Sequence, residues 1–113
     1  MPNAAQYREA AARYRHLGEH YLRHAALVTG WPLATHLGAG VVADAVSGVL
    51  RDAGHHLAAA SSEMAALALV CERRATICDE YQRRVQLHRA LDPMTRLRTP
   101  PPVPPFGWVS GSG

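Results

Sequence analysis

The chain has 113 residues, about half of them apolar, and a formal net charge of +3. That length fits one small domain, and an apolar fraction rich in alanine with a single phenylalanine gives a thin core. The N-terminus carries no apolar leader segment, and the longest strongly apolar run, residues 64–71, is too short to span a bilayer. We therefore expect a cytoplasmic chain without a membrane span, whose export, if it occurs, uses no cleaved signal peptide.

The first predicted element is a helix over residues 4–28. One heptad position on it carries three tyrosines and a valine: Tyr7, Tyr14, Tyr21 and Val28. The alternate position is assigned to Ala10, Leu17 and His24. Repeats of this spacing place side chains on one face of a helix, where large residues interlock with small ones on a facing helix.

A bend follows at Gly30, Trp31 and Pro32. Glycine suits the position just after a helix, and proline suits the first turn of the next one. Residues 33–40 fit either a helical turn or a loop, because two glycines in this segment weaken any helix.

The second predicted element is one long helix over residues 41–91, which contains no proline. At about 1.5 Å per residue it would be roughly 75 Å long. Its small and apolar residues recur at spacings of three and four: Val46, Leu50, Ala53, Leu57, Ala60, Met64, Leu67, Cys71, Cys78, Tyr81 and Val85. Arg74 interrupts this pattern, so either the apolar face opens there or Arg74 meets a carboxylate from a partner. A break at Ser61 and Ser62 would give a three-helix bundle instead, but the unbroken phase favours one helix.

Asp92 and Pro93 end this helix, because the residue before a proline is disfavoured in helical conformation. The sequence thus predicts a helical domain over residues 1–92 and a disordered tail rich in proline, glycine and serine over residues 93–113. The triple-proline segment of the tail favours polyproline II. Phe106 and Trp108 either dock on this chain or a partner, or remain in solvent.

The predicted fold class is therefore all-α, an antiparallel helical hairpin with a Pro-rich tail. A helix of about 25 residues cannot cover one of about 50, so we expect a homodimer or a heterodimer with another helical protein. The expected partner interface comprises Tyr7, Tyr14, Tyr21, Leu57, Met64, Leu67, Cys71, Cys78, Tyr81 and Val85.

Few residues of the chain are of types that could bind a metal, catalyse a reaction or bind nucleic acid. His16, His20 and His24 recur every four residues, a weak signal for a transition-metal site, and we assign neither a metal nor a cofactor. No motif of a hydrolase, metalloprotease or nucleotide-binding loop is present, so we predict that the chain is not an enzyme. The late arginines alternate with acidic residues around the helix, which argues against a phosphate-binding stripe and against nucleic acid as a partner.

A hairpin of about a hundred residues with Trp31 at its bend resembles the WXG family, helical substrates and partners of type VII (ESX) secretion in actinobacteria and relatives. Leu33 stands where the family has glycine, and Val85 stands where its export signal places an acid after Tyr81. The use of arginine as the only long basic residue agrees with a GC-rich genome, such as an actinobacterial one. The resemblance implies a helical dimer in which the other chain carries the export signal.

The sequence therefore predicts a non-enzymatic helical protein that pairs with another helical chain, in a type VII secretion setting. The alternative is a metal- or redox-responsive cytosolic helical bundle that uses the three histidines and the two thiols.

Overall fold

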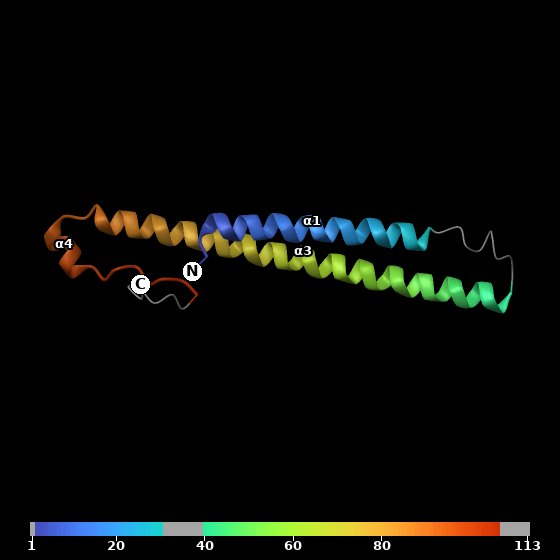
Figure 1. The fold of residues 1–113 in the computed structure, drawn as a ribbon. Helices are drawn as coiled ribbons and strands as arrows, with labels where there is room; N and C mark the ends of the chain where they lie inside the picture. The colour runs from blue at the N-terminus through green and yellow to red at the C-terminus, as the bar shows by residue number, and fades with distance from the viewer. Residues whose placement is uncertain (1, 31–39, 107–113) are drawn as a thin grey trace. The chain divides into compact units, whose positions relative to one another are not determined.

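A computed structural model describes residues 2–30 and 40–106 of the chain. These residues form three helices, α1 (Ala4–Thr29), α3 (Val41–Arg89) and α4 (Pro93–Arg98), drawn in Figure 1. The all-α fold class is confirmed, since the described residues contain no strand. Trp31 and Pro32 of the expected bend lie outside the described residues, whereas Gly30 closes α1 by donating its amide to Ala26 O at 3.0 Å.

The ends of α1 follow from local sequence. Asn3 Oδ1 accepts the amide of Gln6 at 2.9 Å, and Gln6 Oε1 accepts the amide of Asn3 at 2.9 Å. This reciprocal pair is a capping box, which satisfies two amides that the helix leaves without a backbone partner. At the other end, the Thr29 hydroxyl donates to Ala25 O at 2.8 Å.

The long helix α3 runs through Ser61 and Ser62 without a break, so the single-helix prediction is confirmed and the three-helix alternative is wrong. Its 49 residues exceed the 26 of α1. Gly48 lies within it with no side chain or distant backbone close to it, so this glycine weakens the helix without serving a contact.

The chain divides into two compact units, each described here by itself. Unit 1 comprises Met1–Ala10 and Val70–Gly113, and unit 2 comprises Ala11–Leu69. In unit 2, α1 and α3 run antiparallel, because Gly18 meets Ser61 while Ala25 and Thr29 meet Gly54. The antiparallel hairpin predicted from sequence is thus observed.

Small side chains form the contact between the two helices in unit 2. The buried residues of α1 are Ala11, Gly18 and Ala25. From α3 the matching heptad position supplies Gly54, Ser61 and Ala68, of which Gly54 and Ala68 are buried. A Cβ atom built on Gly18 would lie 3.3 Å from both Met64 Cβ and Ser61 O, so the backbones approach closely here. We call these six residues the inner seam.

The structure corrects one part of the predicted pattern on each helix. On α1 the alternate heptad position is held by Ala11, Gly18 and Ala25, and not by Ala10, Leu17 and His24. The tyrosine position was correct, since Tyr7, Tyr14 and Tyr21 are all half-buried. The error is one of spacing: the facing residue comes four positions after each tyrosine rather than three, which moves that residue about 100° around the helix axis.

The same one-residue correction applies to α3. Leu57, Met64, Cys71 and Cys78 lie on the contact as predicted, but the alternate position falls on Gly54, Ser61, Ala68 and Ala75 instead of Ala53, Ala60, Leu67 and Arg74. Ala75 is only 1% exposed, whereas Arg74 is exposed. Arg74 therefore neither opens the helix contact nor needs a carboxylate of a partner at that position.

Candidate interaction surfaces

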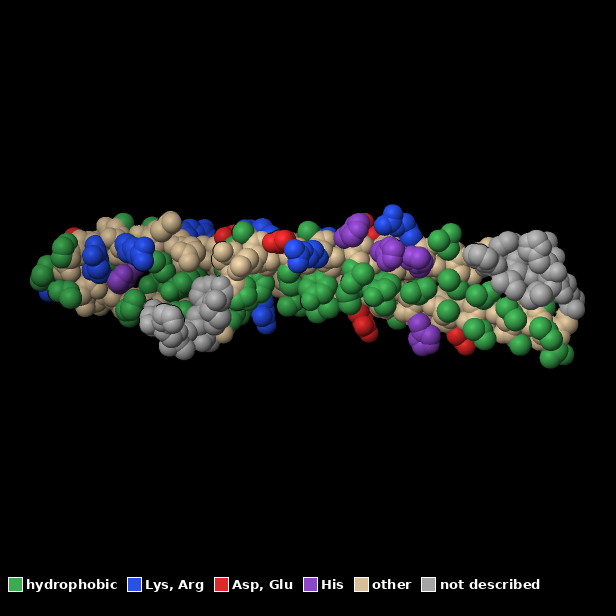
Figure 2. Space-filling view, viewed as in Figure 1, with side chains coloured by type: hydrophobic (Ala, Val, Ile, Leu, Met, Phe, Trp, Pro, Cys, Tyr) green, Lys and Arg blue, Asp and Glu red, His purple; other side chains and the backbone are tan. Residues whose placement is uncertain are grey.

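Unit 2 exposes the large apolar side chains that its inner seam lacks. On α3 a second heptad pattern runs beside the seam, and we call it the outer stripe: Val42, Val46, Val49, Ala53, Ala60 and Leu67. Val42 is 70% exposed, Val49 is 68% exposed and Leu67 is 40% exposed. Figure 2 shows hydrophobic side chains gathered along the α3 side of the molecule. Val46, Ala53 and Ala60 of the stripe are half-buried, so Val42, Val49 and Leu67 are its exposed members.

Helix α1 adds to the same face of unit 2. Leu17 directly precedes the seam residue Gly18, and Leu67 directly precedes the seam residue Ala68. In an antiparallel pair, residues that precede the seam positions of the two helices lie on the same side of the pair. Leu17 of α1, which is exposed, therefore extends the outer stripe into a face made by both helices.

Most residues expected at a partner interface lie on the contact within the chain or beside its tail. Tyr7, Tyr14, Tyr21, Leu57, Met64 and Cys71 are half-buried, and Cys78 is buried. Tyr81 and Val85 are half-buried and line a groove with the tail. Of the expected set only Leu67 belongs to the outer stripe. Sequence reasoning missed Val42 and Val49, although their seven-residue spacing was visible.

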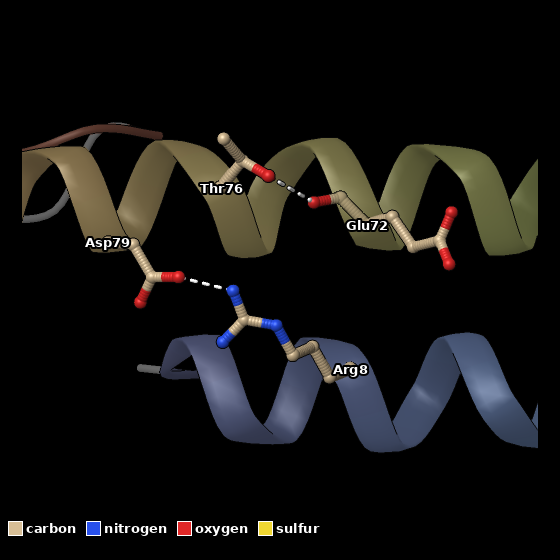
Figure 3. Close-up of polar contacts among 4 residues, drawn as sticks. All are labelled: Arg8, Glu72, Thr76 and Asp79. Carbon is tan, nitrogen blue, oxygen red and sulfur yellow. Dashed lines mark hydrogen bonds and ion pairs between the residues drawn. The ribbon is translucent and has the colours of Figure 1, made fainter.

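One side of unit 1 is polar. Arg8 of α1 forms an ion pair with Asp79 of α3, as Figure 3 shows. Nearby, the Thr76 hydroxyl donates to Glu72 O of its own helix at 3.2 Å. The side chains of Arg8 and Asp79 are 55% and 50% exposed, so water screens the pair and it contributes under about 1 kcal/mol. The ion pair therefore adds little to the stability of unit 1.

The other side of unit 1 is aromatic. Phe106 of the tail packs edge-on against Tyr7 of α1, with ring centroids 6.0 Å apart. The Arg74 guanidinium carbon lies 4.9 Å from the Phe106 centroid and 5.9 Å from the Tyr7 centroid. Each cation–π contact of this kind contributes about 0.5–1 kcal/mol at an exposed site. Of the alternatives left open by the sequence, Phe106 docks on its own chain; Trp108 lies outside the described residues.

The start of the tail is structured rather than disordered. Asp92 caps α4, accepting the Thr95 amide at 2.9 Å and the Thr95 hydroxyl at 2.7 Å. These bonds lower the pKa of the Asp92 carboxyl, the amide bond most. Arg96 donates to the carbonyls of Arg89 and Leu91 at 2.7 and 2.9 Å, which satisfies acceptors left free at the end of α3. The corner between α3 and α4 is therefore defined by four side-chain hydrogen bonds.

Beyond this corner the tail lies against the end of α3. His88 Nε2 is hydrogen-bonded to Thr99 O at 3.0 Å. A groove of about 420 Å³ separates the two segments, lined by Tyr81, Val85, His88 and Arg89 of α3 and by Pro101, Pro102, Val103 and Pro104 of the tail. The tail thus covers part of the surface of α3 for which the sequence predicted a second chain.

The candidate metal and thiol residues do not assemble into a site within the described part of the chain. The His20 and His24 rings are in contact, with centroids 4.3 Å apart, but no group of three His, Cys, Asp or Glu side chains there is placed to hold a metal ion. Burial and then the nearby charge of Asp79 raise the pKa of the Cys78 thiol. A thiol held in its protonated form is a poor nucleophile and a poor metal ligand.

Comparison with protein families, with curated proteins and with solved structures finds no match to this chain. Among the described helices, none has both the length and the hydropathy needed to cross a bilayer.

Proposed function

We propose that this protein is a non-enzymatic helical module that pairs with a second helical chain through the outer stripe of unit 2. One observation carries the proposal: the helices of unit 2 bury alanine and glycine against each other and leave valine and leucine exposed. An apolar face made by both helices of a hairpin is typical of the surface that a second hairpin covers in a four-helix bundle.

The energetics favour pairing. Burying an alanine methyl gains little, whereas full burial of a valine or leucine side chain contributes about 1.5–3 kcal/mol. Val42 and Val49 keep 70% and 68% of their surface in water, so most of that gain is realised only when another chain covers them; Leu67, at 40%, keeps a smaller part of it. The isolated hairpin is consequently marginal, and the pair is expected to be the stable form.

The WXG resemblance extends this proposal to type VII secretion, with the chain as a substrate or as the partner of one. The antiparallel arrangement of α1 and α3 supports that setting, because the family consists of such hairpins. The partner is a second copy of this chain or another helical protein of the same shape.

The proposal is tested by size-exclusion chromatography with multi-angle light scattering at micromolar concentration. We expect a dimer, and we expect Val49→Glu and Leu67→Glu to convert it to monomer, because each places a charge in the proposed contact. Leu22→Glu is the matched control: Leu22 follows Gly18 by four residues, on the opposite side of the seam. A compact wild-type monomer, or equal loss with all three variants, would contradict the proposal.

A second candidate function, metal binding, has one supporting observation in the contact between His20 and His24. Two neighbouring imidazoles supply half of a tetrahedral zinc site. Calorimetric titration with zinc and with copper(I) separates the two functions, since tight binding that a His20→Ala, His24→Ala variant abolishes would favour metal binding over pairing alone.

A further inference from the structure

The tail of unit 1 carries a sequence pattern that the pairing proposal does not use. It places Arg98, Pro101 and Pro104 at intervals of three residues. A segment rich in proline at this spacing is typical of ligands that bind in aromatic-lined grooves of other proteins. We call residues 99–105 the proline segment.

The backbone of the proline segment is extended. Thr99 has a φ of −102° and a ψ of 123°, and residues 100–104 belong to no helix or strand. A proline ring fixes φ at about −65°, and a residue that precedes a proline avoids the helical conformation. Every residue from 100 to 105 meets at least one of these two conditions. The segment therefore favours polyproline II, a helix with three residues per turn and no internal hydrogen bonds.

Three residues per turn give the proline segment three edges, and two of them differ sharply in burial. Pro102 and Pro105 share one edge, and both are half-buried. Pro100 and Val103 share another edge, and both are exposed, Val103 to 85%. The first edge therefore faces the rest of unit 1, and the second faces solvent.

The third edge carries the remaining prolines of the pattern. Pro101 is exposed, while Pro104 is half-buried and lines the groove beside α3, so the chain does not enclose it. Because this edge adjoins the exposed one, Pro100 with Pro101 and Val103 with Pro104 form two successive apolar projections, one turn apart. Both projections are accessible without removing the segment from α3.

The proline segment is held at both ends. His88 Nε2 is hydrogen-bonded to Thr99 O at 3.0 Å where the segment begins. Just beyond its end, the Phe106 ring packs against Tyr7, with centroids 6.0 Å apart. A segment already extended and anchored in this way loses little conformational freedom when a partner binds it.

Charge adds a direction to this surface. Arg98 is exposed and directly precedes the proline segment, and residues 93–113 contain no aspartate or glutamate. A guanidinium at one end of the segment fits a carboxylate at the corresponding end of a partner groove.

We propose that residues 98–104 are a binding segment for a partner protein whose groove is lined by aromatic side chains and ends in a carboxylate. The two apolar projections occupy successive spaces between the aromatic rings, and Arg98 pairs with the carboxylate. This interaction is separate from pairing through the outer stripe, which lies in unit 2.

The test is isothermal titration calorimetry of the full chain with a panel of purified SH3 domains, chosen for aromatic grooves bordered by acidic residues. We expect micromolar binding by the wild-type chain. A double variant, Pro101→Ala with Pro104→Ala, should weaken it by about tenfold or more, because it removes one side of each projection. Arg98→Glu should weaken it by a similar factor, because it places like charges together.

The matched control is Pro102→Ala with Pro105→Ala, which removes two prolines at the same spacing from the half-buried edge. Unchanged binding by this control, with losses in the other two variants, supports the proposal. Equal loss in the control overturns it, because the exposed edges would then have no special role. Absence of wild-type binding to every domain of the panel also overturns it. None of these results depends on self-association, so the pairing proposal stands or falls separately.

Discussion

The two units cover α3 in different ways. In unit 2 a second helix is present, and the residues of the inner seam are no larger than serine, with Tyr14, Tyr21, Leu57 and Met64 half-buried beside them. In unit 1, α1 contributes only Ala4–Ala10, and an extended segment rich in proline covers the end of α3. The comparison shows that close helix pairing places small residues where the backbones meet, whereas the tail segment leaves a groove beside a large residue such as Tyr81.

The largest expected effect comes from filling the inner seam. Gly18→Leu should lower the free energy of unfolding by about 2–3 kcal/mol, because Met64 and Ser61 already stand 3.3 Å from the position of its Cβ. Urea unfolding followed by circular dichroism measures the loss. Gly48→Leu is the matched control, since nothing lies within 4 Å of that Cβ position. Equal losses for the two variants would show that the helices do not meet at Gly18.

The two thiols should differ in reactivity by at least about tenfold. Cys78 is buried and the pKa of its thiol is raised, while Cys71 is half-buried, so alkylation at mildly alkaline pH should reach Cys71 first. Mass spectrometry of timed iodoacetamide reactions measures both rates. In denaturant the rates should converge. Faster labelling of Cys78 in the folded protein would place it outside the helix contact.

Two glycines of α3 should respond to alanine with opposite signs. Gly48→Ala should stabilise the protein by about 0.5–1 kcal/mol through helix propensity alone. At Gly54 the new methyl group would overlap the Thr29 side chain, whose hydroxyl is bonded to Ala25 O, so Gly54→Ala should destabilise by a similar amount. Thermal unfolding of both variants measures the difference, and stabilisation by both would contradict the close approach at Gly54.

The smallest effect concerns the corner of unit 1. The pKa of Asp92 is lowered from its ordinary value of 3.8, so its stabilisation of α4 is complete above that pH and is lost as the pH falls through the lower folded-state value. The Thr95 amide signal should therefore shift only once the pH falls below the ordinary value of 3.8. Asn is a good N-cap without a titrating group, so Asp92→Asn should keep α4 and abolish this shift. An unchanged titration would exclude Asp92 as its source.

The local features of the fold were predictable from the sequence. The capping pair at Asn3, the absence of proline from α3 and the stop near Pro93 depend on neighbouring residues only. The Asp92 and Pro93 pair was interpreted only as the end of one helix, although an N-cap residue followed by proline is also a signal for the start of another. That second meaning accounts for α4.

The phase of the helix contact was not predictable in the same way. Leu17 and Leu67 fit a heptad pattern as well as their neighbours Gly18 and Ala68 do, and hydropathy favours the leucines. The smaller residues lie at the contact because the two backbones approach closely there. This close approach depends on both helices together and cannot be read from either helix alone. The same error affected the candidate surface, because the expected partner interface placed Leu67 with Leu57 and Met64 and left out Val42 and Val49.

The inner seam limits the volume of its side chains more than their polarity, since glycine, alanine and serine all occur there. An added branch disrupts the fit, and at Gly54 even a methyl group does, because it would overlap the Thr29 side chain. Residue identity along the seam can therefore vary only within the space that the facing side chains leave. What the fit requires is a small residue at every seventh position of each helix.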